Sequence, residues 1–238
     1  MDELKELVAK LERAYGDELV SVVLYGSGAG GDHHRKFSDL NVVCVLKRIT
    51  PHELFAGEPV LKWWRDRGHP SPLLMTEEEA HNSSDSFPIE FRDMQDRRKV
   101  LFGSDVIAGI QVDTRYYRVH IEHELRAALF RLRQKGAQLL SDPSALLGLC
   151  ADSVSTFCLL GRHALNAARV ETKLGKRNVV RQLSETLHAD FSAFTVLLDV
   201  REGKTDVDPG DPSELFSRYL EEVRKLVEFV DQLENRGG

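Results

Sequence analysis

The stretch Leu19 to Leu46, LVSVVLYGSGAGGDHHRKFSDLNVVCVL, decides the fold of the amino-terminal half of the chain. Residues 20–25 and 40–46 are apolar runs rich in β-branched residues, which predicts two strands. Four glycines in six residues follow the first run, beginning at Gly26. Because glycine lets the backbone approach a ligand and offer bare N–H groups, this turn is typical of phosphate binding.

Polar side chains open the second predicted strand. Asp39 and Asn41 stand at positions i and i+2, so both are expected on the same face of the strand, beside the glycine turn. A carboxylate next to a phosphate-binding turn indicates a metal-bridged nucleoside triphosphate.

On these residues the chain resembles the nucleotidyltransferase superfamily, which includes DNA polymerase β and the aminoglycoside nucleotidyltransferases. Gly26 and Ser27 match the Gly-Ser of the family, and Asp39 matches the first aspartate of its Asp-x-Asp pattern. The resemblance implies that Gly26 and Ser27 bind the nucleotide, and that Asp39, Asn41 and Glu90 hold Mg²⁺. Asn41 replaces the second aspartate, and its uncharged oxygen should weaken binding of Mg²⁺.

Glu90 is the candidate for the third carboxylate of this family. Apolar and polar residues alternate over residues 87–91, which predicts a half-buried strand with Glu90 on its other face. There it would take the proton of the attacking hydroxyl, so Asp39 and Glu90 are the expected catalytic residues. Asp93 is a competing candidate, and an edge-strand glutamate that merely faces solvent is the alternative.

Composition bounds the class of protein. The 238 residues are 42% hydrophobic and 29% charged, which is ordinary for a globular protein, with a net charge of −6. Neither half is basic, so a long nucleic acid is not the expected partner. Three cysteines in apolar segments without metal-ligand spacing (Cys44, Cys150 and Cys158) predict buried free thiols in the cytoplasm. We find no apolar run of the roughly 18 residues that span a bilayer, so no membrane partner is expected.

The remaining elements of the first half follow from local signals. A helix is expected over residues 2–15, closed by Gly16, and a second one from Thr50-Pro51 to about Asp66. The paired tryptophans Trp63 and Trp64 are interpreted as packing on the sheet rather than stacking on a base. Short strands are expected over residues 72–75 and 99–102.

From Thr114 the pattern changes to amphipathic helices, expected over residues 120–140, 142–174, 178–200 and 213–233, the last capped by Ser213. The predicted fold is an α/β (α+β) nucleotidyltransferase-like mixed sheet with helices (residues 1–112), followed by an all-α up-and-down helical bundle (residues 113–238). This order resembles kanamycin nucleotidyltransferase, with a bundle of the broader HEPN class.

Two charged groups in the bundle are weighed against solvated helix surfaces. His120, His123 and Glu124 share one helix face, where a metal is geometrically feasible, and Glu122 or Glu124 facing a cleft is a second hypothesis. Five cations gather near one helix connection and suit phosphate or RNA: Arg169, Lys173, Lys176, Arg177 and Arg181.

The resulting hypothesis is transfer of a nucleoside monophosphate from a Mg²⁺-bound triphosphate to a hydroxyl of a small molecule or protein, weakened by Asn41. One alternative is a degenerate member that binds nucleotide or a partner without turnover. Another is a HEPN-type ribonuclease, because Arg181 and His188 are seven residues apart and so would share one helix face. A homodimer, in which one bundle completes the cleft of the other subunit, stays open.

Overall fold

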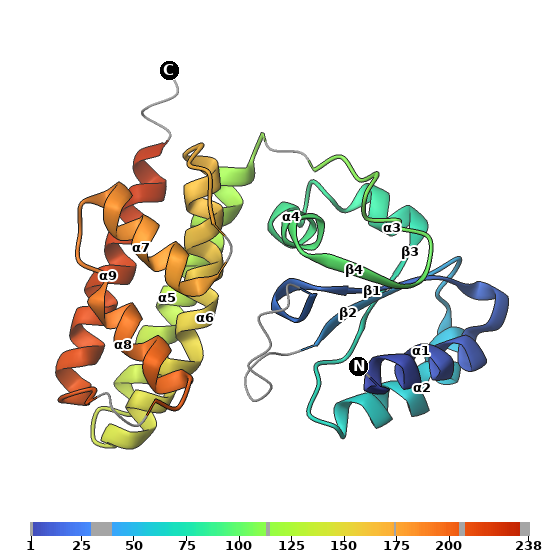
Figure 1. The fold of residues 1–238 in the computed structure, drawn as a ribbon, viewed down its shortest axis with the longest axis horizontal. Helices are drawn as coiled ribbons and strands as arrows, with labels where there is room; N and C mark the ends of the chain where they lie inside the picture. The colour runs from blue at the N-terminus through green and yellow to red at the C-terminus, as the bar shows by residue number, and fades with distance from the viewer. Residues whose placement is uncertain (1, 30–39, 113–114, 174, 205–207, 234–238) are drawn as a thin grey trace. The chain divides into compact units, whose positions relative to one another are not determined.

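The computed structural model describes residues 2–29, 40–112, 115–173, 175–204 and 208–233. They form two compact units, residues 1–114 and residues 115–238. The first unit contains the sheet and the second is helical (Figure 1).

A four-stranded mixed sheet organises the first unit, in the order β3-β2-β1-β4. The central strand β1 pairs antiparallel with β2 and β4, and β2 pairs parallel with β3. The register places Tyr25, the last residue of β1, opposite both Asn41 and Arg98. The strands are β1 (Leu19–Tyr25), β2 (Asn41–Leu46), β3 (Leu73–Thr76) and β4 (Arg98–Gly103).

Helices cover both faces of this sheet, as Figure 1 shows. On one face α1 and α2 pack against Val22 and Leu24, and Trp64 of α2 is fully buried there. On the other face Phe91 and Met94 of α4 belong to the core formed with the alternate strand residues. The packing role of the two tryptophans is therefore confirmed. The helices are α1 (Asp2–Tyr15), α2 (Pro51–Arg65), α3 (Glu77–Asn82) and α4 (Pro88–Asp96).

Local signals set the helix boundaries in this unit. Gly16 follows α1 with φ of +53°, a conformation that glycine adopts without strain. Thr50 caps α2 through a capping box, in which the Glu53 carboxylate accepts the Thr50 backbone N–H at 2.9 Å. Thr76 and Glu79 form the same motif at α3. The predicted start of α2 is confirmed.

The strand predicted over residues 87–91 is wrong. This segment begins α4, with Pro88 in its first turn, where the fixed φ of proline suits a helix. Phe91 and Met94, three residues apart, bury one side of α4, whereas Phe87 is 55% exposed. The apolar and polar residues alternate over residues 87–91 only because Phe87 precedes the helix, whereas Ile89 and Phe91 belong to its buried side.

The second unit contains five helices in its described residues, α5 (Tyr117–Ala137), α6 (Pro143–Ala167), α7 (Lys176–Leu187), α8 (Ser192–Arg201) and α9 (Pro212–Gln232). The long α6 packs against each of the other four. Its buried side chains, among them Val154, Phe157 and Leu165, form the centre of the bundle. The fold is thus an α+β sheet domain followed by a helical region, as expected.

Three helix ends in this unit differ from the prediction. α6 ends at Ala167 rather than near residue 174. The single helix expected over residues 178–200 is two helices, because His188 takes a left-handed conformation with φ of 49° and closes α7. At α9 the cap is Asp211 rather than Ser213, since the Asp211 carboxylate accepts the Ser213 backbone N–H at 2.7 Å.

One described helix, α6, is long and apolar enough to cross a membrane by length and composition, with a mean hydropathy of 1.5 in its best window. This corrects the expectation that no such run exists. Because 44% of that window is buried within the protein and a core helix passes the same test, the match is weak evidence for a span.

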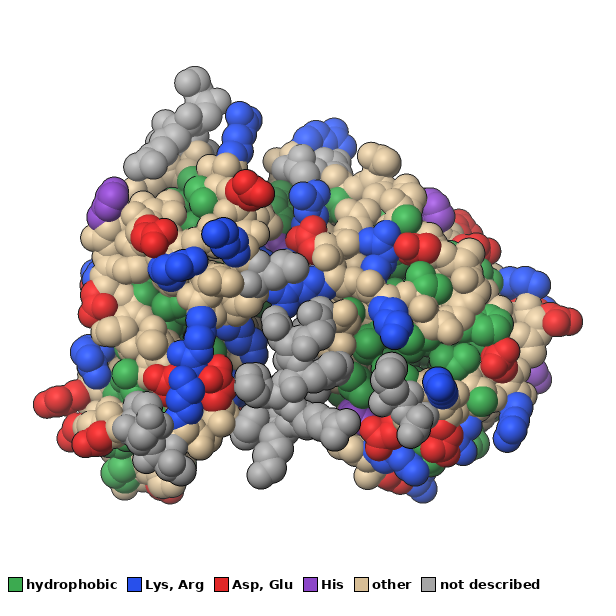
Figure 2. Space-filling view, in the orientation of Figure 1, with side chains coloured by type: hydrophobic (Ala, Val, Ile, Leu, Met, Phe, Trp, Pro, Cys, Tyr) green, Lys and Arg blue, Asp and Glu red, His purple; other side chains and the backbone are tan. Residues whose placement is uncertain are grey.

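Cysteines and charges follow the expected pattern. Cys44, Cys150 and Cys158 are buried and free. On the face that Figure 2 shows, basic and acidic side chains are interspersed over both units.

Candidate functional site

The turn after β1 is the first component of the candidate site. Gly26 begins a short 3-10 helix, Gly26–Ala29, with φ of +73°, which favours glycine. Its N–H donates to the carbonyl oxygen of Arg97 at 2.9 Å, so the turn is fixed to the segment that joins α4 and β4. Ser27 lies within the turn.

Two side chains converge on Gly26. A Cβ atom added there would lie 3.5 Å from Asn41 Nδ2 and 3.5 Å from Asp93 Oδ2, which is ordinary van der Waals contact. Asn41 reaches this point from the first residue of β2, and Asp93 reaches it from α4. The missing side chain of Gly26 therefore leaves a notch bordered by an amide and a carboxylate.

The two carboxylates of α4 act together on Tyr25. Glu90 is exposed and Asp93 is half-buried, and their spacing of three residues places them on one side of the helix. The pKa of the Tyr25 phenol is raised above 10.0, first by burial, then by the negative charge of Asp93, then by that of Glu90. The phenol consequently stays protonated near neutral pH beside a negatively charged helix face.

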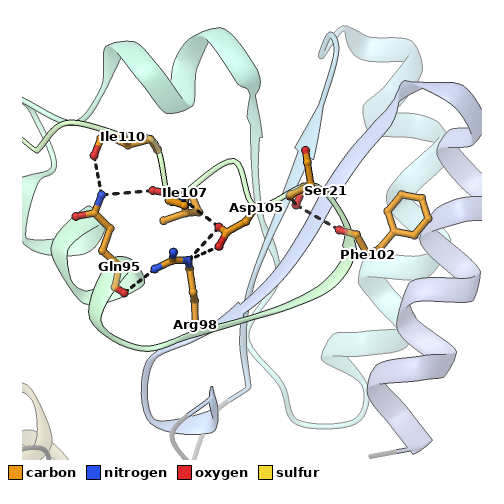
Figure 3. A network of polar contacts seen from close by, with 9 residues as sticks. Ser21, Gln95, Arg98, Phe102, Asp105, Ile107 and Ile110 are labelled. Carbon is orange, nitrogen blue, oxygen red and sulfur yellow. Dashed lines mark hydrogen bonds and ion pairs between the residues drawn. The ribbon is translucent and has the colours of Figure 1, made fainter.

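Polar contacts hold α4 in place at its carboxyl end (Figure 3). Arg98 Nε donates to both carboxylate oxygens of Asp105 at 2.9 Å, and Arg98 Nη1 donates to the Gln95 carbonyl at 2.6 Å. Gln95 Nε2 in turn donates to the Ile110 carbonyl at 2.6 Å. This network joins α4 to β4 and the following loop, so it fixes the position of the helix that bears Asp93.

The expected site residues are only partly brought together. Gly26, Ser27 and Asn41 lie where the sequence placed them, at the end of β1 and the start of β2. Asp39 lies outside the described residues. Glu90 stands on a helix rather than a strand, and Asp93, the competing candidate, is the α4 carboxylate that borders Gly26.

Sequence reasoning gave Tyr25 no role beyond ending a strand. The antiparallel register opposite Asn41 brings it to the site, and only long-range pairing reveals that register. Proline at position 88 is the one local signal that could have identified α4 as a helix and brought Asp93 forward.

The metal hypothesis for the second unit gains no support. Within the described ranges no group of three or more His, Cys, Asp and Glu residues could hold a metal ion. His123 Nε2 lies 3.9 Å from a carboxylate oxygen of the adjacent Glu124. Glu122 pairs with Arg118 and Arg126 at 2.7 Å each, so its carboxylate stabilises α5.

The cation group at the helix connection is partly neutralised. Lys176 Nζ donates to Ser155 Oγ at 2.8 Å, and Arg177 forms ion pairs with Asp199 and Glu202 at 2.6 and 2.5 Å. These contacts join α7 to α6 and α8, which is a structural role.

The face proposed for a ribonuclease is not formed. Arg181 is on α7, 3.9 Å from Glu185, whereas His188 is exposed in the left-handed turn beyond the helix. The i, i+7 relationship on one helix face therefore fails.

No family model and no curated protein matches the chain. Among solved structures it is similar to the crystal structure of spectinomycin adenyltransferase AAD(9) from Enterococcus faecialis with ATP and spectinomycin. The TM-score is 0.59 at 11% identity, over 94% of this chain and 99% of that chain. The fold is nucleotidyltransferase-like. At this identity the likeness establishes the fold alone, and a HEPN-type bundle is not shown.

Proposed function

We propose that this protein binds a nucleoside triphosphate at the Gly26 turn and transfers its nucleoside monophosphate to a hydroxyl group. The observation that carries the proposal is the notch at Gly26, bordered by Asn41 and Asp93, in a nucleotidyltransferase-like fold. The similar solved structure, an adenyltransferase with ATP and spectinomycin, favours ATP as donor and a small molecule as acceptor. A protein acceptor and a homodimer stay predictions.

The glycine turn, an α4 carboxylate and Tyr25 have different roles in the proposed transfer. The Gly26 turn would hold the phosphate oxygens through the backbone N–H group of Ser27, because glycine allows close approach while the Gly26 N–H itself donates to the Arg97 carbonyl oxygen. A carboxylate of α4, Glu90 as expected from the resemblance or Asp93 as its position favours, would accept the proton of the attacking hydroxyl. Tyr25, protonated beside them, would donate a hydrogen bond to an anionic group.

The donor atoms at this site suit Mg²⁺. The Asp93 carboxylate brings a hard oxygen atom, Oδ2, toward Gly26, and Mg²⁺ is usually held by one or two carboxylates together with substrate phosphates. The Asn41 atom nearest to Gly26 is its amide nitrogen Nδ2, so the amide would turn over to offer its oxygen to the ion. Asp39, Asn41 and an α4 carboxylate would hold the ion. When bound, Mg²⁺ would neutralise phosphate charge in the transition state.

One observation favours a second candidate, nucleotide binding without transfer. Asn41 supplies no charge at the position where the resembling family has an aspartate, which lowers the affinity for a hard cation. The ribonuclease hypothesis is not carried forward, because Arg181 and His188 do not share a helix face.

We also infer a reducing compartment such as the cytoplasm. Three buried thiols without a disulfide support it, since buried apolar surroundings raise the pKa of Cys44, Cys150 and Cys158 to about 12 and keep them unreactive.

The experiment that tests the proposed function is pyrophosphate release from ATP, GTP, CTP and UTP with Mg²⁺ and a panel of hydroxyl compounds that begins with spectinomycin. We expect release from one nucleotide that depends on an acceptor, with a mass increase of that acceptor by one nucleoside monophosphate. Saturable nucleotide binding without any release would support the binding role instead. If the protein shows no nucleotide binding and no pyrophosphate release, both candidate functions are overturned.

A further inference from the structure

A pocket of about 250 Å³ lies between α5 and α6, entirely within the second unit. Its floor is apolar and includes Leu132 and Phe157, both buried in the bundle. The volume lies just below the roughly 300 Å³ at which pockets for drug-sized ligands begin, so the occupant would be a small molecule.

Two cations stand at the edge of this pocket. Arg131 and Lys135 are one turn apart on α5, and like charges at this spacing repel each other. Neither side chain has an ion-pair or hydrogen-bond partner in the part of the chain that the structure describes. Two neighbouring cations whose side chains have no ion-pair partner attract an anion.

The acidic residue of the pocket is engaged elsewhere. The Asp152 carboxylate lies 3.4 Å from Arg201 Nη1, which also donates to the Ala151 carbonyl at 3.2 Å. This α8 arginine thus provides the charge partner of Asp152. The cations on the α5 side keep a net positive charge.

Hydroxyl groups complete the α6 side. Ser153 Oγ donates to the Cys150 carbonyl at 2.9 Å and lies 3.0 Å from the Tyr219 hydroxyl. Thr156, one turn further along α6, lines the pocket at the surface and has no hydrogen-bond partner among the described residues. Its hydroxyl can donate to an anionic oxygen opposite the cations.

We propose that the pocket between α5 and α6 binds a small organic anion, an apolar group that carries a phosphate or a carboxylate. Arg131 and Lys135 bind the anionic end, Thr156 donates a hydrogen bond to it, and the apolar body rests on Leu132 and Phe157. This site is separate from the Gly26 turn and does not depend on nucleotide transfer.

Phenyl phosphate is the probe that tests this proposal. It is titrated into the full chain labelled with ¹⁵N, and amide shifts in the two-dimensional spectrum locate the binding. We expect saturable shifts at Ala128, Leu149 and Thr156. Inorganic phosphate and phenol should each bind about tenfold more weakly, because each supplies only half of the contacts.

Three variants separate the site from general charge. R131Q/K135Q should weaken the binding of phenyl phosphate about tenfold or more, since both charge-assisted contacts are lost. Arg133→Gln removes the same charge two residues away, on another side of the helix, and should leave the affinity unchanged. Thr156→Trp fills the pocket with both cations retained and should abolish binding. Circular dichroism confirms that each variant is folded.

Two results would overturn the proposal. The first is an absence of saturable shifts at the pocket residues of the wild-type chain up to high millimolar phenyl phosphate. The second is equal weakening by Arg133→Gln and by R131Q/K135Q, which would mean nonspecific charge attraction. Neither result affects the proposed nucleotide site at Gly26, which its own experiments test.

Discussion

The side chains of Asn41 and Asp93 meet at Gly26, where each has an atom 3.5 Å from the position that a Cβ would occupy. One side chain comes from the start of β2 and the other from α4, 52 residues later in the chain. Because only glycine leaves this space open, the three residues define one site, and its chemistry depends on the charge at position 41.

Asn41→Asp supplies the carboxylate and should raise the rate of Mg²⁺-dependent transfer by at least about tenfold. A tenfold change in rate corresponds to about 1.4 kcal/mol of activation free energy, and an added charged metal ligand should lower the barrier by more than this. Without metal, repulsion by Asp93 should lower the melting temperature of the variant, and Mg²⁺ should restore it. The measurements are pyrophosphate release and thermal unfolding with and without Mg²⁺. No gain in transfer would indicate that the protein binds nucleotide without turning it over.

Gly26→Ala should lower the free energy of unfolding by about 1–2 kcal/mol, since φ of +73° is strained for alanine. Its methyl group should also fill the notch and remove nucleotide binding. Gly68→Ala is the matched control, because Gly68 has φ of +85° and no atom of Asn41, Asp93 or any other described residue beyond its two chain neighbours lies within 4 Å of its Cβ position. The control should lose similar stability and keep nucleotide binding; loss of binding in both variants would contradict the assignment.

The two α4 carboxylates should be separable. Asp93→Asn should lower the pKa of Tyr25 more than Glu90→Gln does, because the charge of Asp93 has the larger effect on that phenol. The measurement is a pH titration of tyrosine ring carbon shifts by NMR. A larger change for Glu90→Gln would place Glu90, rather than Asp93, beside Tyr25 and the Gly26 turn.

Much of the first unit could be predicted from local sequence, because its decisive residues act locally. The apolar runs on either side of the glycine turn predicted β1 and β2, and Thr50 predicted the start of α2. The segment at Glu90 failed, since five residues cannot distinguish a strand from a proline-started helix whose partner is the distant core.

In the second unit the break at His188 could not be predicted for a similar reason. Residues 178–200 keep a helical period and contain no glycine or proline, and the break shows only in local contacts such as the Asp190 carboxylate, which accepts the Ser192 backbone N–H at 2.9 Å. The notch at Gly26 likewise required the β1–β2 register and the placement of α4.

Stability should depend on pH through Glu222 of α9. Its carboxylate accepts the backbone N–H groups of Ala193 and Phe194 at 3.0 and 3.1 Å, at the start of α8. Burial nevertheless raises the pKa of Glu222 from 4.5 to about 7. The folded state therefore holds this proton more tightly than the unfolded state, so its stabilising effect is complete below about pH 4.5 and is lost as the pH rises through about 7.

Glu222→Gln removes this dependence and retains an oxygen acceptor. The free energy of unfolding of the variant relative to wild type should rise by roughly 2–3 kcal/mol between pH 5 and pH 8. Urea unfolding at the two pH values provides the measurement. If the free energies of unfolding of variant and wild type differ by the same amount at pH 5 and pH 8, the Glu222 carboxyl is ionised throughout this range.

The most direct test of the central claim is thermal unfolding of the whole chain with ATP, GTP, CTP or UTP, each with and without Mg²⁺. A nucleotide at about 100 times its Kd adds roughly 2.7 kcal/mol, which corresponds to several degrees in a chain of this size. We predict that one nucleotide raises the melting temperature only with Mg²⁺ present, and that Gly26→Ala abolishes this rise while Gly68→Ala preserves it. No rise with any nucleotide under either metal condition would contradict the nucleotide site.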